Sequence, residues 1–249
     1  MNVEKVQPIY VEGTQKGILM LHGLTASPND FRDYAERFVS KKYTVSVPLL
    51  AGHGTDIQNL EKTKWQEWYA DVKTAYMSLT EKCDQIIVIG QSIGGALALH
   101  LAARYKIDGL VLLAPGLFFK NKATMALPLL SLVKKYINKR NGPDIKNEVS
   151  KKRAISYTKM PLRSISETAH LFEQIKNELH IVFTPVLIFH SIYDHVIDYK
   201  SSEYIFNHIS SKCKRLITLR NSYHILSLDN EKNIILKEII SFIKTTLNQ

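Results

Sequence analysis

The chain has 249 residues, a length typical of one large α/β domain, and 45% of its residues are hydrophobic, as in globular proteins with a packed core. Residues 1–8 lack the apolar stretch behind a basic start that a signal peptide needs. The longest apolar region, residues 86–103, is interrupted by glycine and polar residues, so a membrane span is not expected. Two cysteines, Cys83 and Cys213, provide no disulfide framework. These features predict a soluble cytoplasmic protein.

The net charge of +10 comes mostly from one stretch, residues 134–163, with ten basic and two acidic residues. Such a stretch can attract anionic lipid surfaces or acidic substrates, or it can be a solvated helical surface that keeps the protein soluble. We favour the solvated surface and keep a weak contact with an anionic surface as an alternative. Nucleic acid is not an expected partner, because no aromatic platform accompanies the charge.

Strand-like and helix-like runs alternate along the first half of the chain. The first-half elements that we expect from hydrophobic periodicity are a strand at 17–21, a helix at 28–40 with Ser27 as N-cap, a strand at 43–47, a helix at 65–79, a strand at 86–89, a helix at 92–104 and a strand at 109–114. The second half adds a strand at 185–190, a helix at 199–209, a strand at 215–219 and a helix at 231–247. This alternation predicts the α/β class, with a mainly parallel central sheet flanked by helices.

The interval 117–179 breaks this rhythm. It contains no good strand, a Gly142-Pro143 breaker, and helical patterns at Leu129, Leu132, Val133, Tyr136 and Ile137. We therefore expect residues 1–116 and 180–249 to form the core and 117–179 to form a small helical cap inserted in it. Five apolar residues of the insertion could face a substrate channel, although packing onto the core explains each of them better: Met125, Leu127, Leu129, Leu130 and Leu132.

The motif Gly90-Gln91-Ser92-Ile93-Gly94 lies between a predicted strand and a predicted helix. In that setting G-x-S-x-G is typical of a nucleophile elbow, in which the glycines permit a strained turn that exposes the serine hydroxyl. The alternative is a glycine-rich turn whose serine only caps the helix. A serine needs a base to take its proton, so the elbow predicts a histidine and an acid later in the chain.

Asp194 and His224 are the candidates, and each follows a predicted strand, where an α/β sheet gathers functional groups. His224 would take the Ser92 proton, and Asp194 would orient and stabilise the imidazolium. Asp198 is an alternative acid, but its sequence context favours a helix N-cap. The other histidines are better explained as structural or surface residues: His22, His53, His100, His170, His180, His190, His195 and His208.

The oxyanion of an acyl-transfer reaction needs two backbone N–H donors. Ile93, directly after the serine, is one candidate. Leu24, in the loop after the strand at 17–21, is the other, and its side chain is a candidate for lining the acyl pocket.

Five segments carry a resemblance to a known family. They are residues 21–28 (LHGLTASP), 48–55 (PLLAGHGT), 90–95 (GQSIGG), 193–197 (YDHVI) and 220–224 (RNSYH). With the chain order Ser, Asp, His, the sequence resembles the α/β-hydrolase superfamily, and within it the small bacterial carboxylesterases and monoacylglycerol lipases. The resemblance implies an α/β-hydrolase fold, Ser92, Asp194 and His224 as catalytic residues, Leu24 and Ile93 as oxyanion donors, a compact helical cap, and neither metal nor organic cofactor.

Two positions depart from the family pattern. Gln91 stands where many relatives have a small or apolar residue. A monoglyceride-selective relative is expected to carry an acidic or other polar cap residue, and around that position residues 156–159 (SYTK) include no carboxylate, although Thr158 could hydrogen-bond a hydroxyl. Leu24, Gln91 and Thr158 are the candidate substrate-binding residues. The lack of a carboxylate near Thr158 argues against strict monoglyceride selectivity.

The expected function is hydrolysis of short- to medium-chain carboxylic esters through an acyl-enzyme, with monoacylglycerols among the candidate substrates. A thioesterase or acyltransferase with the same triad is the alternative, followed by interfacial triacylglycerol lipase activity and a non-catalytic ligand-binding role. We expect a monomer or a small homo-oligomer.

Overall fold

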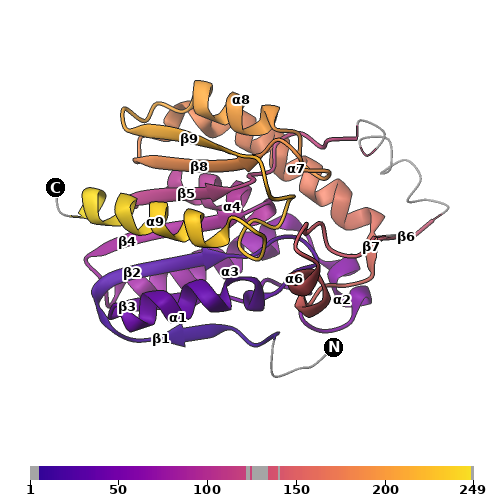
Figure 1. The fold of residues 1–249 in the computed structure, drawn as a ribbon, viewed down its shortest axis with the longest axis horizontal. Helices are drawn as coiled ribbons and strands as arrows, with labels where there is room; N and C mark the ends of the chain where they lie inside the picture. Colours follow the sequence, from indigo (N-terminus) through magenta and orange to yellow (C-terminus); the bar gives the residue numbers. More distant parts are fainter. Residues whose placement is uncertain (1–5, 122–123, 125–133, 140, 248–249) are drawn as a thin grey trace.

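The computed structural model describes residues 6–121, 124, 134–139 and 141–247. Seven strands form one sheet in the order β1-β3-β2-β4-β5-β8-β9 (Figure 1). Their bounds are Ile9–Val11 (β1), Thr14–Leu21 (β2), Tyr43–Val47 (β3), Gln85–Gln91 (β4), Gly109–Leu113 (β5), Val186–Ser191 (β8) and Lys214–Leu219 (β9).

All neighbouring strands of this sheet are parallel except β1, which runs antiparallel along β3 at the edge. The predicted mainly parallel sheet is therefore confirmed. The sequence analysis did not predict β1, because Ile9–Val11 is only three residues long, and in the structure it is half-buried or exposed. The register brings the carboxyl ends of β4, β5, β8 and β9 to one edge of the sheet. Gln91 pairs with Leu113, Leu113 pairs with Phe189, and Ser191, two residues further along β8, pairs with Leu219.

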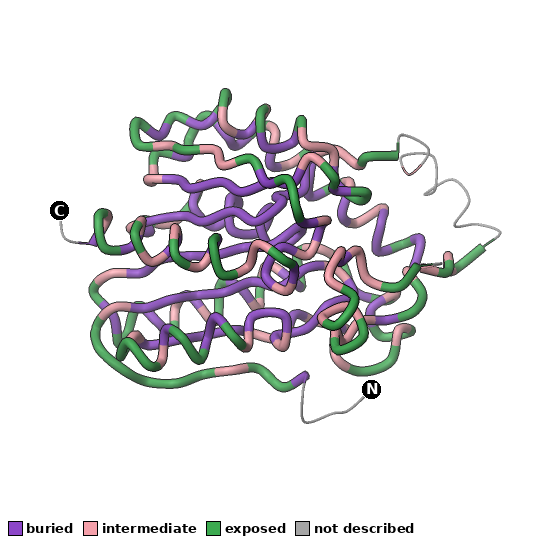
Figure 2. Tube along the Cα trace, in the orientation of Figure 1, coloured by how far each residue is buried: buried purple, intermediate pink, exposed green. Residues whose placement is uncertain are grey.

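Helices cover both faces of the sheet (Figure 1). On one face α1 (Arg32–Ser40), which follows a short 3-10 helix η2 (Pro28–Phe31), and α9 (Lys232–Leu247) pack on the strands through a cluster that includes Phe31, Phe38 and Ile239. The other face is covered by α3 (Trp65–Thr80), α4 (Ile93–Ala102) and α8 (Lys200–His208). The central strands are buried along most of their length, whereas the covering helices are exposed on their outer sides (Figure 2).

Two details differ from the sequence prediction in this part of the chain. A short helix, α2 (Ile57–Lys62), was not predicted, although Asp56 caps it by accepting a hydrogen bond from the backbone N–H of Gln58. Ser27 stands at the N-cap position of η2, but its hydroxyl makes no capping hydrogen bond and is buried without a partner.

The segment 117–179 lies between β5 and β8 in the sequence and, where it is described, contains both helices and strands. Its elements are β6 (Tyr136–Asn138), α6 (Glu148–Arg153), β7 (Lys159–Pro161) and α7 (Leu162–Glu178), followed by η4 (Leu179–Ile181). β6 and β7 form an antiparallel pair (Figure 1). The prediction of a segment without strands was therefore wrong, and Tyr136 and Ile137 belong to β6 rather than to a helix. The predicted channel residues Met125, Leu127, Leu129, Leu130 and Leu132 lie outside the described residues.

Within the described part of the chain, no helix combines the length and apolarity that a membrane crossing requires.

A buried polar cluster joins α7 to α4. Glu178, at the end of α7, hydrogen-bonds through Oε2 to Nδ1 of His100 at 2.7 Å, and Arg104 Nη2 donates to its Oε1 at 2.6 Å. Burial alone would raise the pKa of Glu178, but the hydrogen bonds with His100 and Arg104 outweigh it and lower the pKa from 4.5 to about 2. The Glu178 carboxylate therefore stabilises the folded state as an anion.

Glu178→Gln should lower the free energy of unfolding by about 1–3 kcal/mol at pH 7, because it leaves buried polar groups imperfectly paired. A folded-state pKa below the unfolded one gives stability that is complete above pH 4.5 and is lost as the pH falls toward 2. Urea unfolding at several pH values should therefore show the difference between variant and wild type shrinking below pH 4.5. Glu173→Gln, which removes only an exposed ion pair with Lys176, is the control and should change little. A difference independent of pH would contradict this account.

Candidate active site

A strained turn presents the hydroxyl of Ser92 at the carboxyl end of β4. Ser92 has φ +57° and ψ −118°, in a region that residues other than glycine rarely adopt. A Cβ on Gly90 would lie 2.3 Å from the carbonyl oxygen of Gly94, and one on Gly94 would lie 2.1 Å from the carbonyl oxygen of Leu21. Both positions therefore require glycine. They are the first and last residues of the G-x-S-x-G motif.

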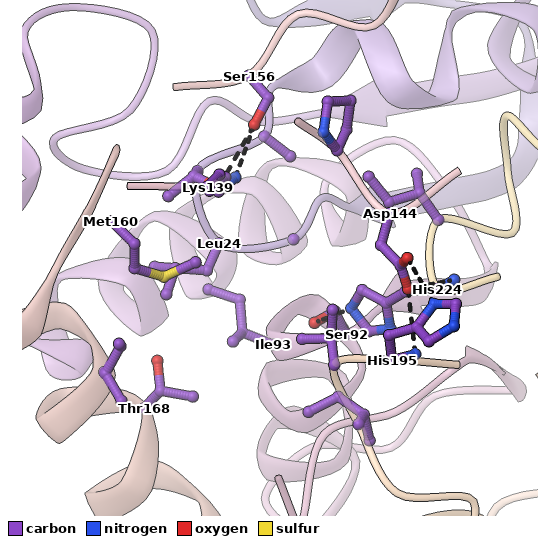
Figure 3. Close-up of a pocket in the computed structure, with 18 of the residues that line it drawn as sticks. Leu24, Ser92, Ile93, Lys139, Asp144, Ser156, Met160, Thr168, His195 and His224 are labelled. Atoms are coloured by element: carbon purple, nitrogen blue, oxygen red, sulfur yellow. Dashed lines mark hydrogen bonds and ion pairs between the residues drawn. The ribbon is translucent and has the colours of Figure 1, made fainter. Parts of the chain in front are cut away.

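Ser92, His224 and Asp194 form a hydrogen-bonded chain (Ser92 and His224 in Figure 3). His224 Nε2 lies 2.9 Å from Ser92 Oγ, and His224 Nδ1 lies 2.6 Å from Asp194 Oδ2. Asp194 lies in the loop after β8, and His224 lies in the loop after β9. The structure thus brings together the three side chains that the sequence analysis selected.

The charges of Asp194 and His224 depend on two opposing effects, burial and the hydrogen-bonded ion pair that they form. Burial would raise the pKa of Asp194, but the charge of His224 and the hydrogen bonds from His190 and His224 hold that pKa well below its usual range. Burial would lower the pKa of His224, but the Asp194 carboxylate, with a smaller contribution from Asp144, raises it above 6.5. Asp194 is therefore an anion, and His224 is a stronger base than burial alone would leave it.

His190 is a second partner of Asp194 that the sequence analysis missed. It is completely buried on β8, and its Nε2 lies 3.2 Å from Asp194 Oδ2, while its Nδ1 lies 2.7 Å from Ser202 Oγ. The other carboxylate oxygen, Oδ1, accepts the backbone N–H groups of Val196 and Ile197 at 2.7 and 2.8 Å. Asp194 is thus held from several directions. The contact with His190 could not be predicted, because nothing in the sequence distinguishes this histidine from any other buried in a strand.

Asp144, in the segment 117–179, contacts the loop that carries His224. The sequence analysis did not predict this contact. Its backbone carbonyl accepts the backbone N–H groups of His224 and Ile225 at 3.1 Å, and its Oδ2 also accepts the backbone N–H of His224 at 3.2 Å. Its Oδ1 lies 2.9 Å from Nδ1 of His195, the residue after Asp194 (Figure 3). His195, predicted to be a surface residue, has a 61% exposed side chain, in keeping with that prediction. Eighty residues separate Asp144 from His224, so no local pattern could reveal the contact.

Leu24 and Ile93, the candidate oxyanion donors, line the same cavity as Ser92. The loop after β2 passes beside the serine, since a Cβ built on Gly23 would lie 3.4 Å from the Ser92 Cβ and 4.0 Å from its Oγ, which are ordinary contact distances. Thr25, the next residue after Leu24, has a positive φ of 64°, so this loop is itself strained. The two candidate donors thus belong to segments that border the same cavity as Ser92.

The cavity above Ser92 has a volume of about 310 Å³. Ile165 and Phe172 of α7, with Ile197, contribute apolar surface to its lining. Another part is polar: Lys139, which follows β6, donates a hydrogen bond through Nζ to Ser156 Oγ at 2.8 Å (Figure 3).

Lys139 Nζ also donates to the hydroxyl of Thr25, in the loop that carries Leu24. Burial lowers the pKa of Lys139 to about 8, although the charge of Asp30 partly opposes this. Burial raises the pKa of Asp30 to about 7, and its Oδ2 is buried without a hydrogen-bond partner. The sequence analysis assigned Lys139 to a solvated basic surface, so its place in the cavity lining corrects that assignment.

The three candidate substrate-binding residues differ in their positions. Leu24 and Gln91 line the cavity, although the Gln91 side chain is already used, since its Oε1 accepts the backbone N–H of Ser227 at 3.0 Å. Thr158 is exposed and does not line this cavity; its carbonyl accepts the backbone N–H of Lys139 at 2.9 Å. Asp198, the alternative acid, instead accepts the N–H of Lys200 at 3.1 Å in the first turn of α8.

No group of three or more His, Cys, Asp or Glu side chains among the described residues is arranged to hold a metal ion.

The chain is similar to known proteins over nearly its whole length. The sequence is 34% identical over 244 residues to a thermostable monoacylglycerol lipase of Bacillus sp. (strain H-257), covering 95% of this chain and 93% of the relative. It is 25% identical over 247 residues to a carboxylesterase of Bacillus subtilis (strain 168), covering 98% of each chain.

Among solved structures, one from a study of the metagenome-derived lipolytic enzymes LipS and LipT matches with a TM-score of 0.92 and 33% identity, over 97% of this chain and 98% of that one. A monoacylglycerol lipase of Paleococcus ferrophilus, at 16% identity and a TM-score of 0.81, covers 96% of this chain and 98% of its own and shares the fold. The family model described as serine aminopeptidase, S33, matches residues 13–232. The chain therefore belongs to this family and has the α/β-hydrolase fold.

Proposed function

We propose that the protein is a serine carboxylic-ester hydrolase that forms an acyl-enzyme on Ser92. The observation that carries the proposal is the hydrogen-bonded chain from Ser92 through His224 to Asp194, which opens into a largely apolar cavity. Relatives named as a monoacylglycerol lipase and a carboxylesterase, matched over nearly the whole chain, favour esters over the peptides in the family's name.

The proposed reaction begins when Ser92 Oγ attacks the ester carbonyl carbon and His224 Nε2 takes its proton. The backbone N–H groups of Leu24 and Ile93 stabilise the tetrahedral oxyanion, and each such donor is worth about a hundred- to thousand-fold in rate. His224 then gives the proton to the leaving alcohol, and the acyl group stays on Ser92. A water molecule, deprotonated by His224, releases the carboxylic acid and restores the serine.

The cavity supports short- to medium-chain acyl groups as substrates. A volume of about 310 Å³ lies at the lower end of the range for small-molecule sites. The polar residues Lys139, Ser156 and Asp30 offer hydrogen-bonding groups that suit the hydroxyls of a monoacylglycerol. This assignment replaces Thr158, which lies outside the cavity, while Leu24 remains the candidate acyl-pocket residue. The segment 117–179 would serve as the cap that encloses the substrate.

A thioesterase or acyltransferase would use the same serine, histidine and aspartate, and only the leaving group or the acceptor would differ.

Purified wild-type protein should hydrolyse p-nitrophenyl butyrate and 1-monolauroylglycerol, and Ser92→Ala should lower both rates by at least about a thousand-fold, because no other group can carry the acyl intermediate. An aminoacyl p-nitroanilide in the same assay tests the peptidase activity in the family's name, and we expect no turnover. Equal rates for wild type and Ser92→Ala would rule out this mechanism, and turnover of acyl-CoA thioesters alone would favour the thioesterase.

The pH dependence should report the raised pKa of His224. The base must be neutral, so kcat/KM should fall as the pH drops through a value above 6.5. In Asp194→Asn the charge that raises this pKa is gone, so NMR titration of His224 should give a lower value, and kcat should drop by about three to four orders of magnitude.

The charge of Asp144 also raises the His224 pKa, but by less than that of Asp194. Asp144→Asn should therefore lower the His224 pKa by less than Asp194→Asn does. An unchanged His224 titration in Asp194→Asn would contradict the assignment of Asp194 as the partner that sets it.

A further inference from the structure

A second cavity of about 520 Å³ lies between α7 and α8, next to the one that contains Ser92. Leu117, Phe118, Ala169 and Tyr204 contribute apolar surface to its lining. Charged residues also line it, and two of them, Glu173 and Lys176, form an ion pair at 2.6 Å on the surface of α7. The mechanism proposed above makes no use of this space.

The two cavities share two lining residues, Phe119 and Phe172. The centroids of their rings lie 5.2 Å apart with the planes tilted by 42°, so the rings touch. Helix α7 borders both cavities. On α7, Ile165 and Thr168 face the Ser92 cavity, whereas Ala169 lines the second one. The partition is therefore made in part by two side chains.

The backbone around the partition is fixed. Phe119 forms an isolated antiparallel bridge with Ile197, and hydrogen bonds from Lys120 N to Val196 O and from Asp198 N to Phe118 O, both of 2.9 Å, flank it. Ring rotation can therefore open a passage while these backbone hydrogen bonds stay in place.

The two rings differ in freedom. Phe172 is 2% exposed and lies against Gly116, where an added Cβ would come within 2.2 Å of the ring. Phe119 is only half-buried, and rotamer changes of partly exposed side chains are fast. Phe119 is therefore the ring that can turn aside.

We propose that the cavity between α7 and α8 is a second acyl subsite, which receives the distal end of a long fatty-acyl chain passing Phe119 from Ser92. This inference rests on the proposed ester hydrolysis and extends it from short and medium chains to long ones. Its apolar part would bury the terminal methylenes, and the position of Phe119 would set the chain length at which the subsite is used.

Ala169→Trp tests the subsite by filling it. Residue 169 lines the second cavity and not the first, so kcat/KM for p-nitrophenyl dodecanoate should fall by about ten-fold, the worth of two buried methylenes, while that for the butyrate stays unchanged. Asn177→Trp places the same side chain on the exposed surface of α7, outside the linings of both cavities, and should alter neither rate.

Phe119→Ala tests the passage and should raise the dodecanoate-to-butyrate ratio of kcat/KM, and adding Ala169→Trp should cancel that gain. Butyrate hydrolysis that depends on Ser92 verifies the proposed function separately. If Ala169→Trp lowers both rates equally or changes neither, or if the gain in Phe119→Ala survives in the double variant, the second cavity is not an acyl subsite.

Discussion

The buried carboxylate of Asp194 is the constraint on which the rest of the site depends. An anion that is 2% exposed is costly unless hydrogen bonds satisfy it, and here two histidines and two backbone N–H groups do so. Those partners come from β8, from the loop after it and from the loop after β9. The parallel pairing of β8 with β9 must therefore keep its register, because a shift would separate His224 from Asp194. In turn, His224 reaches Ser92 only because the strained turn after β4 holds the hydroxyl in place.

The segment 117–179 is bound to the same machinery by polar contacts. Asp144 holds the backbone at His224, and Lys139 holds the hydroxyl of Thr25 beside Leu24. Asp229, in the loop after β9, accepts the backbone N–H groups of Lys146 at 2.8 Å and of Tyr223 at 2.7 Å, so it ties the segment to the histidine loop. If this segment covers the substrate as proposed, its contacts at His224 and beside Leu24 couple its position to the geometry of the groups proposed to react. Specificity and catalysis would therefore respond together to changes in this segment.

The sequence predicted the central strands to within a few residues, because fully buried parallel strands appear as continuous apolar runs, and it placed α3, α4 and α9 about as closely. It gave no bounds for the 17-residue helix α7, which it expected only as part of a helical insertion. It failed where elements are short and depend on a distant partner. The edge strand at 9–11 is only three residues long, and Tyr136–Asn138 forms a strand only because it pairs with Lys159–Pro161, about twenty residues away. In isolation, Tyr136 and Ile137 fit a helical pattern equally well, so local periodicity could not decide between the two.

The sequence by itself determined which three side chains form the hydrogen-bonded chain: Ser92, His224 and Asp194. Each follows a recognisable strand, and parallel strands bring their carboxyl ends to one edge of the sheet. The glycines of the elbow are likewise explicit in the sequence. Only the tertiary structure decided that His190 and Asp144 join this group, that Lys139 lines the cavity and that Thr158 does not. Those outcomes depend on how the segment 117–179 packs against the sheet, and on burial, which turns a surface-type lysine or aspartate into part of a site.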